Sequence, residues 1–142
     1  MEAEVDFRCM DATDMAAFPD ASFASLFDKG TLDTLDTRED GDEVSQAVVR
    51  EAARVLKPGG HWVIVSCRSE ARRMECIRGG SGVAAYYFTL VESATLKHDA
   101  AAAEAAGAAG AAGAAGGDAK GSTVLVLRRA NTAGLDAEAA AA

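Results

Sequence analysis

The chain has 142 residues, a length that suits one domain better than two. Its formal net charge of -8 disfavours the anionic backbone of nucleic acid as a partner, and suits a basic protein or a small molecule. No run of about 18 apolar residues is present to cross a membrane, and the first residues, MEAEVDFRCMD, lack the basic start and apolar core of a signal peptide. The sequence therefore predicts a soluble, cytoplasmic protein that contacts neither nucleic acid nor membrane.

The residue types that bind metals or form disulfides are few and scattered. Cys9, Cys67 and Cys76 form no CxxC pair, and His61 and His98 have no partner at ligand spacing. An odd number of cysteines argues against a disulfide framework, and this spacing does not suit a structural zinc site. We therefore expect a reducing compartment and no metal site.

The first part of the chain contains two short apolar runs with strand character. Residues 5–10 form a run that ends at Asp11, and residues 23–27 form a second run that is compatible with a buried parallel strand. From residue 43 the apolar residues recur at helical spacing. This pattern predicts a helix that ends at the KPGG sequence of residues 57–60, because proline cannot continue a helix and glycine adopts a left-handed turn without steric cost.

Three further strands and a second helix are expected after this turn. The run WVIVSC is the clearest strand, and its nearly continuous apolar character is typical of a strand buried on both faces. The arginines of the second helix are interpreted as a solvent-exposed face. The alternation of strands and helices predicts an α/β fold with a mainly parallel sheet and an antiparallel pair at one edge. The strands are residues 62–67, 86–96 and 123–127, and the helix is residues 68–78.

Composition divides the chain into one folded unit and two alanine-rich segments. We expect a partial domain over residues 1–98 and its final strand over residues 122–130. Between them, residues 99–121 contain the run GAAGAAGAAGG, which predicts a low-complexity loop, since each glycine disfavours helix by about 1 kcal/mol. Residues 131–142 are expected to form a disordered tail.

Three motifs resemble the class I methyltransferases that use S-adenosylmethionine (SAM). They are VDFRCMDATDM, FPDASFASLFDKGTLDTL and VVREAARVLKPGGHWVIVS, in this order. The last is shared by many such enzymes. The phrase DKGTLD is narrower and is similar to the group that includes the lysine methyltransferases of translation elongation factor 1A. The resemblance covers residues 5–67 by motif and the later strands by topology.

The resemblance implies an incomplete Rossmann-like sheet. The family sheet has seven strands in the spatial order 3-2-1-4-5-7-6, and the strands expected here correspond to strands 3 to 7, with strands 1 and 2 missing. The glycine-rich cofactor loop that follows strand 1 is also absent. Strand 4 would then be an exposed edge, which favours pairing with another chain. We expect the chain to be the C-terminal portion of a longer enzyme, or to obtain the missing strands from a second chain.

The resemblance also assigns site residues, since ligands of open α/β sheets bind at the carboxyl ends of the strands. Asp11 and Ala12 match the position that contacts adenine. Asp28 and Gly30 match the position near the methionine end of SAM, so the expected cofactor-binding residues are Asp11, Ala12, Asp28 and Gly30. Asp28 and Lys29 are the expected catalytic residues, with Asp28 orienting an incoming amine. The alternatives are a helix cap for Asp11 and an ordinary solvated strand exit for Asp28 and Lys29.

The function implied is transfer of a methyl group from SAM to an amine of a protein or small molecule, with protein lysine as the acceptor suggested by DKGTLD. The alternative is a non-catalytic fragment or pairing module that does not bind SAM on its own. A nucleotide-dependent oxidoreductase shares the α/β pattern, but it requires a glycine fingerprint that this sequence lacks.

Overall fold

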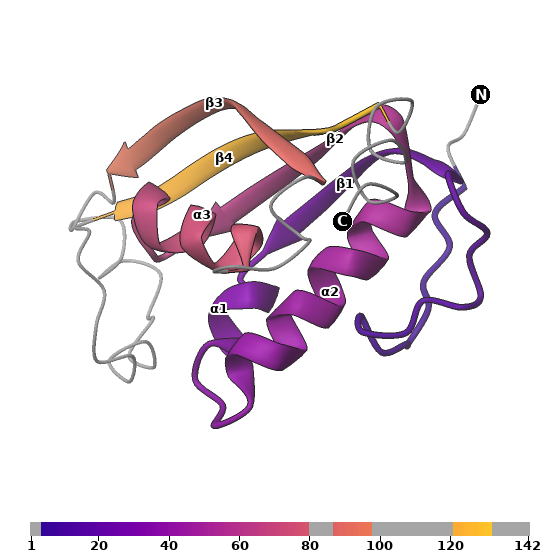
Figure 1. Ribbon diagram of the computed structural model, residues 1–142, viewed down its shortest axis with the longest axis horizontal. Coiled ribbons are helices and arrows are strands. Elements are labelled where there is room, and N and C mark those ends of the chain that lie inside the picture. Colours follow the sequence, from indigo (N-terminus) through magenta and orange to yellow (C-terminus); the bar gives the residue numbers. More distant parts are fainter. Residues whose placement is uncertain (1–3, 80–86, 98–120, 132–142) are drawn as a thin grey trace, which may run out of the picture.

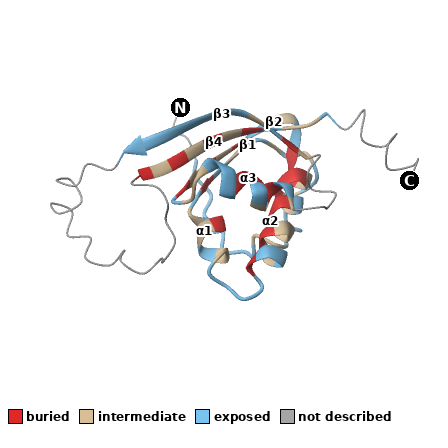
Figure 2. Cartoon of the chain, turned by 60° about the vertical axis from the view of Figure 1, so that its left-hand side comes forward, coloured by how far each residue is buried: buried red, intermediate tan, exposed pale blue. Residues whose placement is uncertain are grey.

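The computed structural model describes residues 4–79, 87–97 and 121–131 (Figure 1). Strands and helices alternate in the first half, and two strands follow. The helices pack against one face of a single sheet (Figures 1 and 2). The elements are β1 (Phe23–Lys29), α1 (Thr31–Leu35), α2 (Gly41–Val55), β2 (Leu56–Ser66), α3 (Glu70–Arg78), β3 (Phe88–Lys97) and β4 (Gly121–Arg129).

The sheet has four strands in the order β1-β2-β4-β3. β1 pairs with β2 in parallel, whereas β4 pairs with both β2 and β3 in antiparallel fashion. This order is the 4-5-7-6 part of the sheet that the resemblance implied. The expected α/β fold, with an antiparallel pair at one edge, is therefore confirmed. The expectation of a mainly parallel sheet is wrong for the described strands, because two of their three pairings are antiparallel.

The core lies between the sheet and helix α2. Trp62 and Ile64 of β2 are buried on the same face as Leu125 of β4, and Val49 of α2 packs into this cluster. Figure 2 shows the buried positions along β2, β4 and α2. The expectation that β2 is buried on both faces is wrong, because Val63 and its neighbours on the opposite face are only half-buried. The described helices cover one face of the sheet, so that face holds the apolar core.

The expected strand over residues 5–10 does not form. Val5 and Phe7 are 67% and 90% exposed, and β1 lies at the edge of the sheet that the described residues form. A strand needs a neighbour to satisfy its backbone N–H and C=O groups. No described strand pairs with residues 5–10, so this apolar run alone does not produce a strand.

Arg54 of helix α2 holds the segment that precedes β1. Its guanidinium donates hydrogen bonds to the carbonyl oxygens of Met15 and Phe18, each at 2.9 Å. It also pairs with Asp20 at 2.7 Å, and Glu51 accepts the Met15 N–H at 2.7 Å. These bonds fix the end of an irregular segment against α2, although the segment has no strand or helix of its own.

Helix α2 ends at Val55, before the proline that was expected to stop it, and β2 begins at the next residue. The glycines of the KPGG sequence therefore lie inside the start of β2. A Cβ on Gly60 would lie 2.8 Å from the Lys57 carbonyl oxygen and 2.9 Å from that of Ala24. Glycine is required here because β1 and β2 approach closely where their register shifts, between Phe23 and Ser25.

The short helix α1 has no counterpart among the elements expected from sequence. The expected loop over residues 99–121 falls outside the described residues except for Gly121, and the expected tail does so except for Asn131. None of the helices in the described ranges combines the length and apolar character needed to cross a bilayer.

The core can be tested with two leucines on adjacent strands. Leu125→Ala should reduce the free energy of unfolding by about 2–5 kcal/mol, because Leu125 is fully buried and its removal leaves a cavity. The matched control is Leu96→Ala in β3, where the leucine is 53% exposed and little packing is lost. Urea unfolding of both variants measures the difference, and equal losses would place the core elsewhere.

Candidate functional site

Asp28 lies near the carboxyl end of β1, where the expected site was placed, and it is only 8% exposed. Its Oδ1 atom accepts the Thr31 N–H at 3.0 Å. Its Oδ2 atom is buried and has no hydrogen-bond partner in the part of the chain that the structure describes. A buried carboxylate oxygen without a partner is unfavourable, so this oxygen is suited to accept a hydrogen bond from a ligand.

Gly30 links the ends of β1 and β2. Its N–H donates to the Val65 carbonyl oxygen at 3.1 Å, and its left-handed backbone, with φ 79°, starts helix α1. A Cβ at Gly30 would meet no atom within 4 Å, so open space lies beside this backbone. A side chain would nevertheless be strained here, because L residues rarely adopt this φ.

Lys29 is exposed and, as the residue after Asp28 in the strand, points to the opposite side of the sheet. The structure therefore does not bring the Lys29 ammonium to the Asp28 carboxylate. The two expected catalytic residues share one strand end but face different surroundings.

Asp11 and Ala12 line a cavity of about 420 Å³ between the irregular N-terminal segment and helices α1 and α2. The Asp11 Oδ1 atom accepts the Thr13 N–H at 2.8 Å and the Thr13 Oγ1 hydrogen at 2.7 Å, and these bonds lower the pKa of Asp11. Its Oδ2 atom takes no hydrogen bond from any described residue. The full lining is Met10, Asp11, Ala12, Thr13, Thr31, Leu35, Arg38, Val44 and Val48.

Thr31 connects the two halves of the expected site. It lines the cavity with Asp11 and Ala12, and its N–H is the group bound by Asp28. The structure thus places Asp11, Ala12, Asp28 and Gly30 around the start of helix α1. The cavity offers an apolar wall and a carboxylate, and the strand end offers a buried carboxylate oxygen.

A charged network behind this site was not expected from the sequence. Arg73 of α3 is completely buried, and its guanidinium contacts Asp33 and lies 3.0 Å from the Asp36 carboxylate. Asp33 also accepts the Ser66 hydroxyl hydrogen at 2.6 Å and the Cys67 N–H at 2.8 Å. The interpretation of the helix arginines as a solvated face is wrong for Arg73, because two carboxylates compensate its charge and allow burial.

The pKa values in this network follow from the competition between burial and charge. For Asp33, burial by itself raises the pKa, but the hydrogen bonds from Ser66 and Cys67 and the charge of Arg73 outweigh it, so its pKa lies below the usual value. For Arg73, burial by itself lowers the pKa, but the charges of Asp36 and Asp33 raise it by more. The pKa of Arg73 therefore lies above its usual value. Asp33 and Arg73 are therefore both ionised at neutral pH.

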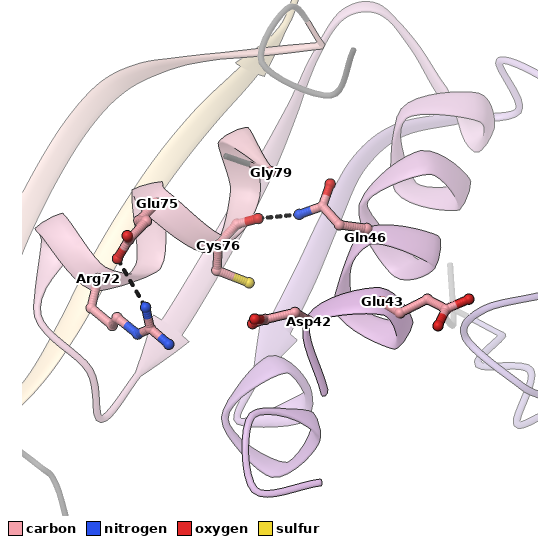
Figure 3. Close-up of a pocket in the computed structure, with 7 residues that line it drawn as sticks. All are labelled: Asp42, Glu43, Gln46, Arg72, Glu75, Cys76 and Gly79. Atoms are coloured by element: carbon pink, nitrogen blue, oxygen red, sulfur yellow. Dashed lines mark hydrogen bonds and ion pairs between the residues drawn. The ribbon is translucent and has the colours of Figure 1, made fainter. Parts of the chain in front are cut away.

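A second cavity, of about 370 Å³, lies between α2 and α3 (Figure 3). Gln46 bridges the two helices by donating to the Cys76 carbonyl oxygen, and Arg72 pairs with Glu75 at 2.9 Å. None of the expected site residues lines this cavity. Its charged groups of both signs are exposed, and it is not part of the candidate site.

Residues 1–64 match the family described as "Methyltransferase domain". Among curated proteins, the human "eEF1A lysine and N-terminal methyltransferase" is 42% identical over 65 residues, and its Drosophila melanogaster homolog is 41% identical over 69 residues. The human match covers 44% of this chain and 9% of the relative, and the fly match covers 47% and 10%. The matched segment is thus about a tenth of these relatives' length.

The fold matches solved methyltransferases over a larger share of the chain. A SAM-dependent methyltransferase from Methanosarcina mazei aligns with a TM-score of 0.62 at 11% identity, covering 90% of this chain and 68% of that one. A DNA modification methylase from Thermus thermophilus, complexed with SAM, aligns with a TM-score of 0.53 at 20% identity, covering 85% and 54%. The domain match of residues 1–64 and this shared fold together confirm the resemblance to class I SAM-dependent methyltransferases.

The buried network predicts a specific dependence of stability on pH. At pH 7, Asp33→Asn should reduce the free energy of unfolding by about 1.5–3 kcal/mol, the usual contribution of hydrogen bonds to a charged group. Because the folded pKa of Asp33 is lowered, its contribution is complete above the unfolded value of about 3.9 and is lost as pH falls through the folded value. The difference between the two proteins should therefore shrink below about pH 4.

Urea unfolding between pH 7 and pH 3 measures this difference. Asp40→Asn is the control, because Asp40 pairs with Arg38 at an exposed position and should change the unfolding midpoint little. A difference between wild type and Asp33→Asn that stays constant over the whole pH range would contradict the role given to Asp33.

Proposed function

Because this chain shares the methyltransferase domain over residues 1–64, we propose that it carries part of the active site of a SAM-dependent methyltransferase acting on an amine, with protein lysine as the acceptor. The observation that carries the proposal is the buried, unpartnered Oδ2 atom of Asp28, beside a cavity lined by Asp11 and Ala12. We also propose that residues 1–98 and 122–130 form one domain, which the neighbouring positions of β2, β4 and β3 support.

The described residues fit SAM in their chemistry. The cavity beside Asp11 has apolar walls, including Leu35, Val44 and Val48, which suit an adenine ring. The free Oδ2 atom of Asp11 can accept a hydrogen bond from an exocyclic amine, and Ala12 adds a small side chain to the same wall.

Asp28 and Gly30 would bind the methionine end of SAM, where Gly30 leaves open space.

SAM, when bound, supplies an electrophilic methyl group on a sulfonium sulfur. The chain's own contribution is to orient the acceptor and exclude water. The Asp28 Oδ2 atom can accept an N–H from the incoming amine and so direct the nitrogen lone pair. A lysine ammonium must lose its proton before its nitrogen attacks the methyl group, and the Asp28 carboxylate can accept that proton as a general base. Lys29, exposed at the same strand end, is proposed to act at the rim of the site.

Protein lysine is favoured as the acceptor by the named activity of the similar proteins and by charge. The net charge of -8 attracts basic protein surfaces, on which lysine is abundant. A cytoplasmic location is part of the same proposal. The DKGTLD sequence, whose first residue is Asp28, lies within residues 1–64, the segment that matches the methyltransferase domain.

A second candidate function, a non-catalytic pairing module, is favoured by the exposed edge of β1. Phe27 is 69% exposed on this strand, and β1 pairs on one side only among the described strands. An edge of this kind can accept a further strand from another chain. This alternative predicts a folded chain that does not bind SAM without its partner.

Calorimetric titration of SAM into the purified chain separates the two candidates. Saturable binding supports the enzyme, whereas no binding by a folded chain supports the pairing module. In the first case Asp11→Ala should weaken SAM binding about tenfold, equivalent to the loss of about one hydrogen bond. Asp14→Ala is the control, since Asp14 is exposed and does not line the cavity. Unchanged affinity in Asp11→Ala would remove Asp11 from the site.

Turnover tests the role of Asp28. Asp28→Asn preserves the shape of the side chain but removes its charge, and should lower kcat by about 100-fold or more if the carboxylate acts on the amine proton. Methylation of a lysine-containing protein substrate with labelled SAM measures kcat, and circular dichroism checks the fold. Asp42→Asn, an exposed acid of α2, is the control. Full activity of Asp28→Asn would assign Asp28 a purely structural role.

A further inference from the structure

Arg73 connects three segments that meet behind the candidate site. From α3, its Nε atom lies 3.2 Å from the Ser66 hydroxyl at the end of β2. Its Nη2 atom contacts Asp33 of α1 and lies 3.0 Å from Asp36, which caps the end of that helix. None of the Arg73 side chain is exposed. One guanidinium therefore joins the end of β2 to both ends of a very short helix.

Helix α1 depends on such contacts, because its five residues are too few to form a stable helix by themselves. The helix starts at Thr31, whose N–H is bound by the Asp28 carboxylate at 3.0 Å. The preceding residue, Gly30, donates to β2 at Val65. The position of Asp28 relative to the cavity is thus set by where α1 lies, and α1 is held from behind by Arg73.

We propose that Arg73 is a positioning residue for the methyl-transfer site: through Asp33 and Asp36 it fixes α1, and through α1 it fixes the Thr31 N–H and the Asp28 carboxylate. This inference rests on the proposed function, since it identifies what positions that site. Arg73 touches none of the residues expected to bind SAM, so its effect on ligand binding is transmitted through α1.

The geometry requires arginine rather than any cation. The Arg73 guanidinium directs its Nε atom at the Ser66 hydroxyl, its Nη2 atom at the carboxylates of Asp33 and Asp36, and its Nη1 atom at Asp36. A lysine ammonium is a single charge on a flexible stem and does not reproduce this planar fork. Arg73→Lys should therefore keep the charge balance of the network while loosening the position of α1.

Amide hydrogen exchange, followed by NMR on the full chain, tests the proposal. In Arg73→Lys, the amides of Gly30 and Thr31 should exchange about tenfold faster or more, while those of the β2–β4 ladder, such as Ile64, should change less than about threefold. Arg72→Lys is the matched control on the same helix, because Arg72 makes an exposed pair with Glu75 and should leave both sets of amides unchanged.

Equal acceleration of all amides would overturn the proposal, because Arg73 would then contribute to global stability only. Unchanged exchange at Gly30 and Thr31 would also overturn it. If Arg73→Lys does not fold, Asp36→Asn applies the same test more mildly, since the contact of Arg73 with Asp33 remains.

The exchange experiment is independent of ligand binding, so it separates the two proposals. The wild-type chain could fail to bind SAM while the amides of Gly30 and Thr31 exchange faster in Arg73→Lys. This result would count against the proposed function and would support the coupling of Arg73 to α1. Where wild type binds SAM, Arg73→Lys should weaken binding about tenfold or more and Arg72→Lys should not. Wild-type affinity in Arg73→Lys would overturn the positioning role.

Discussion

The central position of β2 is the constraint on which the rest of the structure depends. β2 pairs in parallel with β1 along one edge and in antiparallel fashion with β4 along the other. Its buried side chains, among them Trp62 and Ile64, form the floor on which α2 packs. Because both edges and one face of β2 are occupied, its position determines where the neighbouring strands end, and the candidate site lies at such an end.

Two polar groups lie near the carboxyl ends of β1 and β2, and they differ in whether they have hydrogen-bond partners. Arg73 is buried with two carboxylates and a hydroxyl, so its desolvation is compensated within the chain. The Asp28 Oδ2 atom is buried with no described partner. The first arrangement gives a rigid support, whereas the second leaves one acceptor for a ligand. The proposed site therefore combines fixed support with an unsatisfied acceptor, an arrangement that is organised in the absence of a ligand.

The edge strand β1 pairs with another described strand on one side only. One edge of β1 pairs with β2. Asp28 is buried, whereas the neighbouring Phe27 is largely exposed. The similar solved structures are longer than the aligned part of this chain, which spans 68% of the M. mazei protein. The M. mazei protein thus includes residues beyond the part that aligns with this chain. Met10, at the end of the exposed run of residues 5–10, lines the cavity beside Asp11.

Local patterns in the sequence were sufficient to predict most elements and the resemblance to methyltransferases. The helical spacing before residue 56 and the WVIVSC run predicted α2 and β2, because each pattern reflects burial against one partner. The DKGTLD and KPGG phrases indicated the methyltransferase fold and placed Asp28 at a strand end. These features depend on short-range periodicity and turn chemistry, which a sequence carries in full.

Pairing and burial at a distance were decided only by the tertiary structure. Residues 5–10 have a strand-like pattern but no described neighbour, so they do not form a strand. Arg73 lies in a charged run typical of a solvated helix, yet it is buried because Asp33 and Asp36, about forty positions earlier, approach it in space. The sequence by itself determined most of the strands and helices, with residues 5–10 and α1 as the exceptions, and which family they resemble. The tertiary structure decided which charges meet, because the free energy of a buried charge depends on partners that only folding brings together.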